Sequence, residues 1–117
     1  AGHAWEMAKG SNHDIKIFWD NVPLLPGIND LLCKGFVTGA SYRNLNSFEE
    51  KVVLNPKLSS IAKNLLFDPQ TSGGLLVSVN ASQVDNVLKE FEKKGYVAGE
   101  VGEVVQKSSS NPIVVII

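Results

Sequence analysis

The stretch that decides the fold runs from Leu65 to Val79 and reads LLFDPQTSGGLLVSV. Its last part, Leu75 to Val79, is short, apolar and partly β-branched, which predicts a buried strand. Pro69 fixes its own backbone angle and moves Asp68 out of the helical region, so a helix before it must end there. The stretch therefore predicts a helix end, a tight polar turn and a core strand in succession.

The polar turn inside this stretch combines two hydroxyl side chains, Thr71 and Ser72, with the glycine pair Gly73 and Gly74. One interpretation is an anion nest, in which successive backbone N–H groups at the glycines point toward a phosphate. The other is a turn into a core strand, with Asp68 capping local amides. No lysine and no helix follow the glycines, which excludes a Walker-type loop and a dinucleotide fingerprint.

Composition limits the function classes that remain. The 117 residues are enough for one domain with a real core, and 44% hydrophobic with 20% charged residues is typical of a globular chain. The net charge of −1 comes without a basic cluster, so no nucleic-acid partner is expected. No apolar run reaches membrane-spanning length, so no membrane partner is expected. The single Cys33 cannot form an internal disulfide, which fits a reducing, cytoplasmic setting.

Hydrophobic periodicity and breaker residues predict the remaining elements. Helices are expected at 2–9, 26–34, 58–66 and from an Asn80 or Ser82 cap to Gly95, and strands at 15–19, 75–79, 96–105 and 113–117. Because helices and strands are interleaved, we expect an α/β (α+β) fold with a mixed β-sheet covered by helices. The segment 107–111 is expected to be a polar hairpin loop between the last two strands.

A second polar region, Gly35 to Asn46, is rich in Gly, Ser, Thr and Asn and is expected to be a loop. Arg43 and Asn44 stand out in it, because an arginine on such a loop is a reasonable contact for an anion. A solvated surface arginine is the other interpretation. Cys33, just before this region, is interpreted as a small core residue rather than a nucleophile, since no paired base is recognisable.

The residue pattern supplies no catalytic constellation. There is no Cys–His metal spacing and no recognisable acid–base pair. Asp14, Asp20 and Asp68 lie at expected loop edges and have the chemistry of Mg²⁺ ligands, but loops favour aspartate in any case. Residue chemistry alone therefore predicts an α/β domain with one candidate anion site.

The amino-acid sequence of the central motif resembles that of a known protein family. LFDPQTSGGLL, residues 66–76, resembles the hallmark of the C-terminal domain of the selenophosphate synthetase (selenide, water dikinase) family. Stretches 2–8, 22–27 and 99–104 resemble further segments of that domain, in the expected order. Residues 39–44 resemble the family's Gly-Gly-Thr-x-x-Asn loop, with Ala40 and Ser41 as departures.

The resemblance implies a fold and an activity. The family belongs to the aminoimidazole ribonucleotide synthetase superfamily, so residues 1–117 are expected to be a single C-terminal domain. The nucleotide-binding N-terminal domain is then expected to be missing. The intact enzyme is expected to use ATP, selenide and water, with Mg²⁺, to make selenophosphate, AMP and phosphate. It is also expected to be a cytoplasmic homodimer.

The same resemblance places the family's catalytic Cys or selenocysteine, its Lys and its metal-binding aspartates before residue 1 of this chain. No catalytic residue, no bound cofactor and no activity are therefore expected for the chain alone. Six residues are the expected phosphate-binding set over ATP. They are Thr71, Ser72, Gly73, Gly74, Arg43 and Asn44.

Three alternatives remain open. The motif around Gly73 either contacts ATP or only shapes the entry of a core strand. The chain is either part of a dikinase or a stand-alone small-anion-binding or regulatory module, and its abrupt start favours a fragment. The third alternative is that the chain is part of another ATP-dependent enzyme of the superfamily, although the sequence of residues Asp68–Gly74 favours the dikinases.

Overall fold

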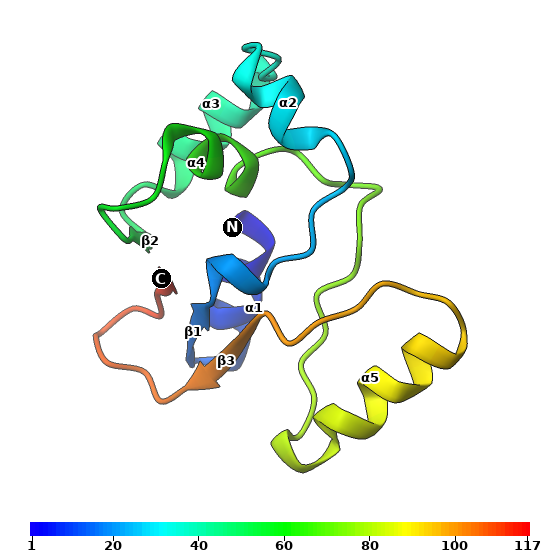
Figure 1. Ribbon diagram of the computed structural model, residues 1–117. Helices are drawn as coiled ribbons and strands as arrows, with labels where there is room; N and C mark the ends of the chain where they lie inside the picture. The colour runs from blue at the N-terminus through cyan, green and yellow to red at the C-terminus, as the bar shows by residue number, and fades with distance from the viewer.

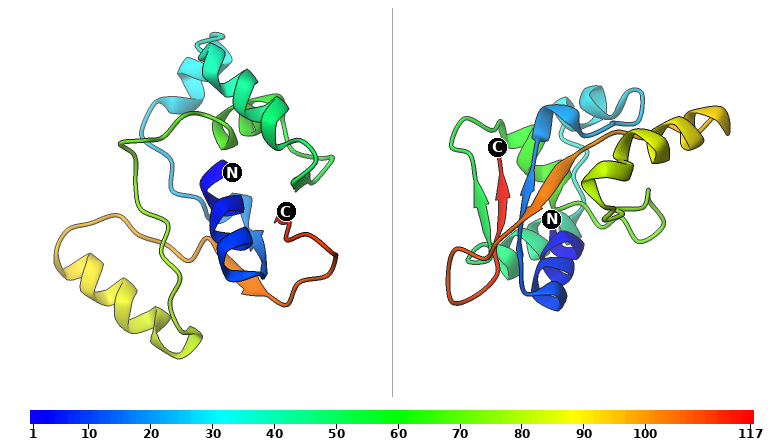
Figure 2. Two further views of the ribbon diagram at one scale, coloured as in Figure 1. Left: turned by 180° about the vertical axis from the view of Figure 1, so that it is seen from behind. Right: turned by 90° about the horizontal axis from the view of Figure 1, so that it is seen from below.

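A computed structural model describes all 117 residues and confirms the expected α/β fold with a mixed sheet. The four strands are β1 (Asp14–Ile17), β2 (Val52–Leu54), β3 (Gly102–Val105) and β4 (Val114–Ile116). They lie side by side in the order β2-β4-β1-β3, as the right-hand view of Figure 2 shows. β4 is parallel to both β1 and β2, whereas β3 is antiparallel to β1.

The core forms on one face of this sheet. Alternate strand residues share a face, and here they are Ile15, Ile17, Val52, Val114 and Ile116. Helix α1 (Gly2–Ser11) packs on that face through two alanines four residues apart, Ala4 and Ala8, which are both buried. The end of α4 (Ser60–Leu66) completes the core with Leu66 and Phe67.

Gly102 shows why β3 can lie against β1. A Cβ at this position would overlap the backbone carbonyl oxygen of Lys16 on the neighbouring strand. Only glycine permits the two backbones to approach this closely.

Most helix predictions are confirmed. Besides α1 and α4, the chain forms α2 (Ile28–Cys33) and α5 (Val84–Lys93), with short 3₁₀ turns η1 (Trp19–Asn21) and η2 (Ala81–Gln83). Gly95 follows α5 with a φ of 75°, as expected of a residue that ends a helix. Gly10 does not end α1; Asn12 does, in the left-handed conformation with a φ of 57°. None of the helices is long and apolar enough to cross a bilayer.

Two local expectations between residues 33 and 48 are wrong. Residues 39–48 form helix α3 (Gly39–Phe48) rather than a loop. The helix begins where the Thr38 side chain accepts a hydrogen bond from the Ser41 backbone N–H at 3.2 Å. Phe48, at its end, packs edge-to-face on Trp5 with the ring centroids 5.7 Å apart. Cys33 is exposed rather than part of the core, because α2 contributes no buried residue.

The expected hairpin at 107–111 is also wrong, because β3 and β4 lie on opposite sides of β1 and do not pair. The connection instead passes the beginning of β1, where the buried Asp14 carboxylate holds it. Asp14 accepts hydrogen bonds from the Ser108 N–H at 2.8 Å, the Ser108 hydroxyl at 2.6 Å and the Ile113 N–H at 2.9 Å. Burial alone would raise the pKa of Asp14, but these bonds and the charge of Lys107 outweigh it and lower the pKa.

The expected strand at 75–79 is wrong as well. The segment pairs with no strand, and Leu75 is 93% exposed. Residues 96–98 are likewise outside the sheet, and only Gly102–Val105 of the expected 96–105 strand pairs. Figure 1 shows α5 held away from the sheet between these two extended segments. An apolar run forms a strand only where a neighbouring strand edge supplies hydrogen bonds, and this segment pairs with no edge of the sheet.

Candidate functional site

Helix α3 and the end of α4 bring together the two regions in which site residues were predicted. The Ser41 hydroxyl of α3 donates to Asp68 Oδ1 at 3.2 Å. The Asn44 side-chain amide, one turn further along α3, donates to the Phe67 carbonyl at 2.9 Å. Figure 1 and the left-hand view of Figure 2 place α3 next to α4. The loop-like sequence at 39–44 is therefore attached to the beginning of the Asp68–Gly74 motif.

Thr71 to Gly74 form the free part of the motif. All four residues are exposed, and the Thr71 and Ser72 hydroxyls make no hydrogen bond within the chain. The turn is closed by the Gly73 N–H, which donates to the Gln70 carbonyl at 3.1 Å. Two donors on adjacent side chains are therefore available to a ligand, and their role in phosphate binding stays a prediction.

The glycines of the motif do not adopt the left-handed conformation that one form of anion nest uses. That form places a left-handed residue next to a right-handed one, whereas the other form is made in a turn. The glycines with positive φ in this chain are Gly27, Gly35 and Gly95, so neither glycine of the motif is left-handed. Any contact that Gly73 or Gly74 makes with a phosphate would therefore use the turn form of a nest rather than the αR-αL form.

Arg43 and Asn44 differ in what they already contact. Arg43 is exposed and forms no ion pair, and its guanidinium lies near the first turn of α3, since a Cβ on Gly39 would be 3.6 Å from its Nη1. Asn44 is half-buried and donates to Phe67. Of the two, Arg43 has the unengaged donors, while one donor of Asn44 serves the fold.

The acidic side chains do not form a metal site. No group of three or more His, Cys, Asp and Glu residues lies close enough together to hold an ion. Asp14 accepts bonds from the 108–113 connection and Asp68 from Ser41, which uses carboxylate oxygens that an ion would need. These residues do not fit a Mg²⁺ site.

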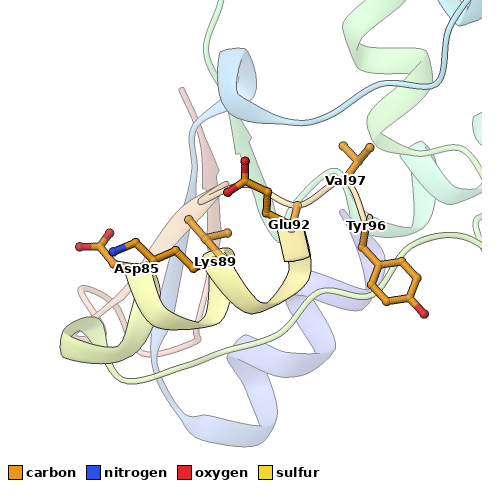
Figure 3. Close-up of a pocket in the computed structure, with 7 residues that line it drawn as sticks. Asp85, Lys89, Glu92, Tyr96 and Val97 are labelled. Atoms are coloured by element: carbon orange, nitrogen blue, oxygen red, sulfur yellow. The ribbon is translucent and has the colours of Figure 1, made fainter. Parts of the chain in front are cut away.

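A separate hollow lies elsewhere, along α5. It has a volume of about 380 Å³ and is open to solvent. Figure 3 shows Asp85, Lys89 and Glu92 of α5 beside it, with Tyr96 and Val97 beyond the helix end. No predicted phosphate-binding residue lines this hollow, and its side chains do not converge on one point.

Sequence reasoning missed Ser41, which is 3% exposed and connects α3 to Asp68. In the sequence, Ser41 stands out only as a departure from the family's Gly-Gly-Thr-x-x-Asn loop. The signal that was available is spacing, because Ser41 and Asn44 lie three residues apart and so share one face of a helix. That signal was hidden while the segment was interpreted as a loop.

Comparison with known proteins supplies the family. Residues 1–115 match the family described as AIR synthase related protein, C-terminal domain. The chain is 37% identical over 114 residues to a selenide, water dikinase of Clostridium botulinum (strain Alaska E43 / Type E3), covering 97% of this chain and 33% of that protein. It is 42% identical over 107 residues to one of Dechloromonas aromatica (strain RCB), covering 88% and 31%. It is 43% identical over 100 residues to one of Pseudomonas straminea, covering 86% and 28%.

The chain thus spans about a third of the length of the curated relatives it matches. The match to the family covers nearly all of its residues, including both α3 and the Asp68–Gly74 motif. The chain therefore belongs to the AIR synthase related protein C-terminal domain family, within which it is similar to selenide, water dikinases.

Proposed function

We propose that this chain serves as the C-terminal domain of a selenide, water dikinase. In this proposal the longer enzyme converts selenide, ATP and water into selenophosphate, AMP and phosphate. The observation that carries it is the 37% identity over 114 residues to a protein of that name, which covers 97% of this chain. Use of Mg²⁺, a homodimeric state and a cytoplasmic location belong to the same proposal for the longer enzyme.

Within that enzyme, the chain binds and orients ATP rather than performing the chemistry. The Thr71 and Ser72 hydroxyls and the Arg43 guanidinium are exposed donors without partners in the chain, and such donors are suited to phosphate oxygens. Holding a substrate in the reactive geometry lowers the barrier without any proton transfer by the groups that hold it. The Thr71–Gly74 turn would thus form one wall of the cleft over the ATP phosphates.

The proposal is tested by comparing the longer protein that carries this chain with the chain alone. Both are incubated with ATP and Mg²⁺, with and without selenide, and AMP is measured. We expect AMP formation that depends on selenide from the longer protein and none from the chain alone. AMP formation by the chain alone would contradict the proposal that the chain binds and orients ATP but does not perform the chemistry. If the longer protein forms no AMP and the chain by itself binds inorganic phosphate, these results would instead support the alternative of a small-anion-binding module.

A further inference from the structure

The point where α4 ends is held by two side chains from a helix far away in the sequence. Ser41 reaches Asp68 over 27 residues, and Asn44 reaches the Phe67 carbonyl over 23 residues. Phe67 is 2% exposed and belongs to the core, so the chain is fixed in position there. Two adjacent residues are therefore held by three independent contacts, one apolar and two polar.

The Ser41 hydroxyl is itself oriented. It lies 3.0 Å from the Thr38 Oγ1, and Thr38 caps α3 by accepting the Ser41 N–H. Ser41 is buried, so its hydroxyl has few other directions available. Hydroxyls that bond to each other and to a carboxylate strengthen one another in a water-poor setting. Thr38, Ser41 and Asp68 thus form a short chain of hydrogen bonds that fixes the Asp68 carboxylate.

The hydrogen bonds from α3 reach the motif only as far as Asp68. Pro69 restricts the backbone, and the one backbone bond that closes the following turn is internal, from Gly73 to Gln70. Phe67 and Asp68 therefore determine the direction in which the Thr71–Gly74 turn extends from the folded core.

We propose that Ser41 and Asn44 are positioning residues for ATP binding. They touch no substrate, and they act by fixing the direction in which the Thr71 and Ser72 hydroxyls point. This inference rests on the proposed function, because it requires that the turn contact the ATP phosphates. It assigns to α3 a second use besides packing, and it separates Asn44, which supports the turn, from Arg43, which is free to bind.

The test uses the longer protein and two matched pairs of variants. Ser41→Ala and Asn44→Leu each remove one of the two bonds to the motif. Ser47→Ala and Asn46→Leu change the same residue types at exposed positions of the same helix and leave both bonds intact. We expect Ser41→Ala and Asn44→Leu each to raise the KM for ATP about fivefold with kcat changed less than about twofold, as loss of substrate positioning at binding predicts. The control variants should change neither.

A double-mutant cycle separates positioning from a general loss of structure. Ser41→Ala is combined with Thr71→Ala/Ser72→Ala, and the KM for ATP is measured for each. If Ser41 acts through the two hydroxyls, its effect should largely disappear once they are removed. Additive effects would overturn the inference. Because Asn44→Leu tests the same claim at another bond, the claim remains falsifiable if Ser41→Ala does not fold.

The failures of the two proposals are distinguishable. If Thr71→Ala/Ser72→Ala alone leaves the KM for ATP unchanged, the turn does not bind ATP, and both the contact and its positioning are overturned. If that variant raises the KM while Ser41→Ala and Asn44→Leu do not, the contact stands and only the positioning role is overturned.

Discussion

The two halves of one short motif differ sharply in how they are held. Phe67 is 2% exposed in the core, and Asp68 accepts a hydrogen bond from Ser41. A few residues later, Thr71 to Gly74 are all exposed, and neither hydroxyl there has a partner in the chain. The first half belongs to the fold, and the second half is available to a ligand.

This difference changes the choice that the sequence left open. The motif was interpreted either as a structural turn or as an anion site, as if one role excluded the other. The structure gives the motif a beginning that is held by the fold and an end that is exposed. The binding role of the exposed end stays a prediction.

The sharpest contrast in stability concerns Phe67. Phe67→Ala should lower the free energy of unfolding by about 3–5 kcal/mol, because it leaves a cavity in the core. Leu75→Ala, directly after the turn at a position that is 93% exposed, should change it by less than about 0.5 kcal/mol. Urea unfolding of the two variants measures both values. Similar losses in the free energy of unfolding for the two variants would contradict the distinction between the buried beginning of the motif and its exposed end.

A second comparison concerns the 108–113 connection and tests how much the carboxylate that holds it contributes to the free energy of unfolding. Asp14→Asn should lower the free energy of unfolding at neutral pH by about 1–3 kcal/mol, because bonds to a charged acceptor are replaced by weaker ones. Asp20→Asn is the control, since Asp20 is exposed and accepts no side-chain hydrogen bond.

The pH dependence of the Asp14 contribution follows from the direction of its shift. The pKa of Asp14 is lowered in the folded chain from its ordinary value of 3.8. Its stabilisation is therefore fully present above that value and is lost as the pH falls below it toward the folded pKa. Unfolding curves of the unchanged chain and Asp14→Asn should thus converge below pH 3.8. A constant difference down to the lowest pH would contradict this assignment.

A smaller effect is expected at the cap of α3. Thr38→Ala removes the acceptor of the Ser41 N–H and should lower the free energy of unfolding by about 1 kcal/mol. Ser47→Ala, whose exposed hydroxyl only donates back to Arg43 in the same helix, should have almost no effect. Thermal unfolding of the two variants, compared at equal concentration, gives the difference. No loss in Thr38→Ala would mean that the cap does not support α3.

Much of the fold was predictable because its signals are local. Periodic apolar residues and end residues predicted α1, α2, α4 and α5, and β-branched runs predicted β1 and β4 to within a few residues, whereas only the second half of the expected 96–105 strand forms β3. Helix α3 was missed because Gly, Ser and Asn favour loops, whereas a cap, an aromatic contact and two long-range hydrogen bonds stabilise it as a helix. The segments 75–79 and 107–111 failed for a related reason, since pairing depends on which strand edge is nearby.

The candidate site was predictable in part. The sequence identified Thr71, Ser72 and Arg43 as available donors, and the structure leaves all three exposed. It did not identify Ser41, because the spacing of Ser41 and Asn44 indicates a shared face only if the segment is a helix, and it does not indicate a partner 27 residues away. The phosphate-binding role of the whole set stays a prediction.

The most direct test of the division between the two halves is one variant measured in two ways. Thr71→Ala/Ser72→Ala is made in the longer protein, and its unfolding temperature and its KM for ATP are determined. We expect an unfolding temperature close to that of the unchanged protein and a KM for ATP raised about tenfold, because two donors to a charged phosphate are lost. An unchanged KM would contradict the account, and so would a large fall in unfolding temperature, because the hydroxyls would then belong to the fold.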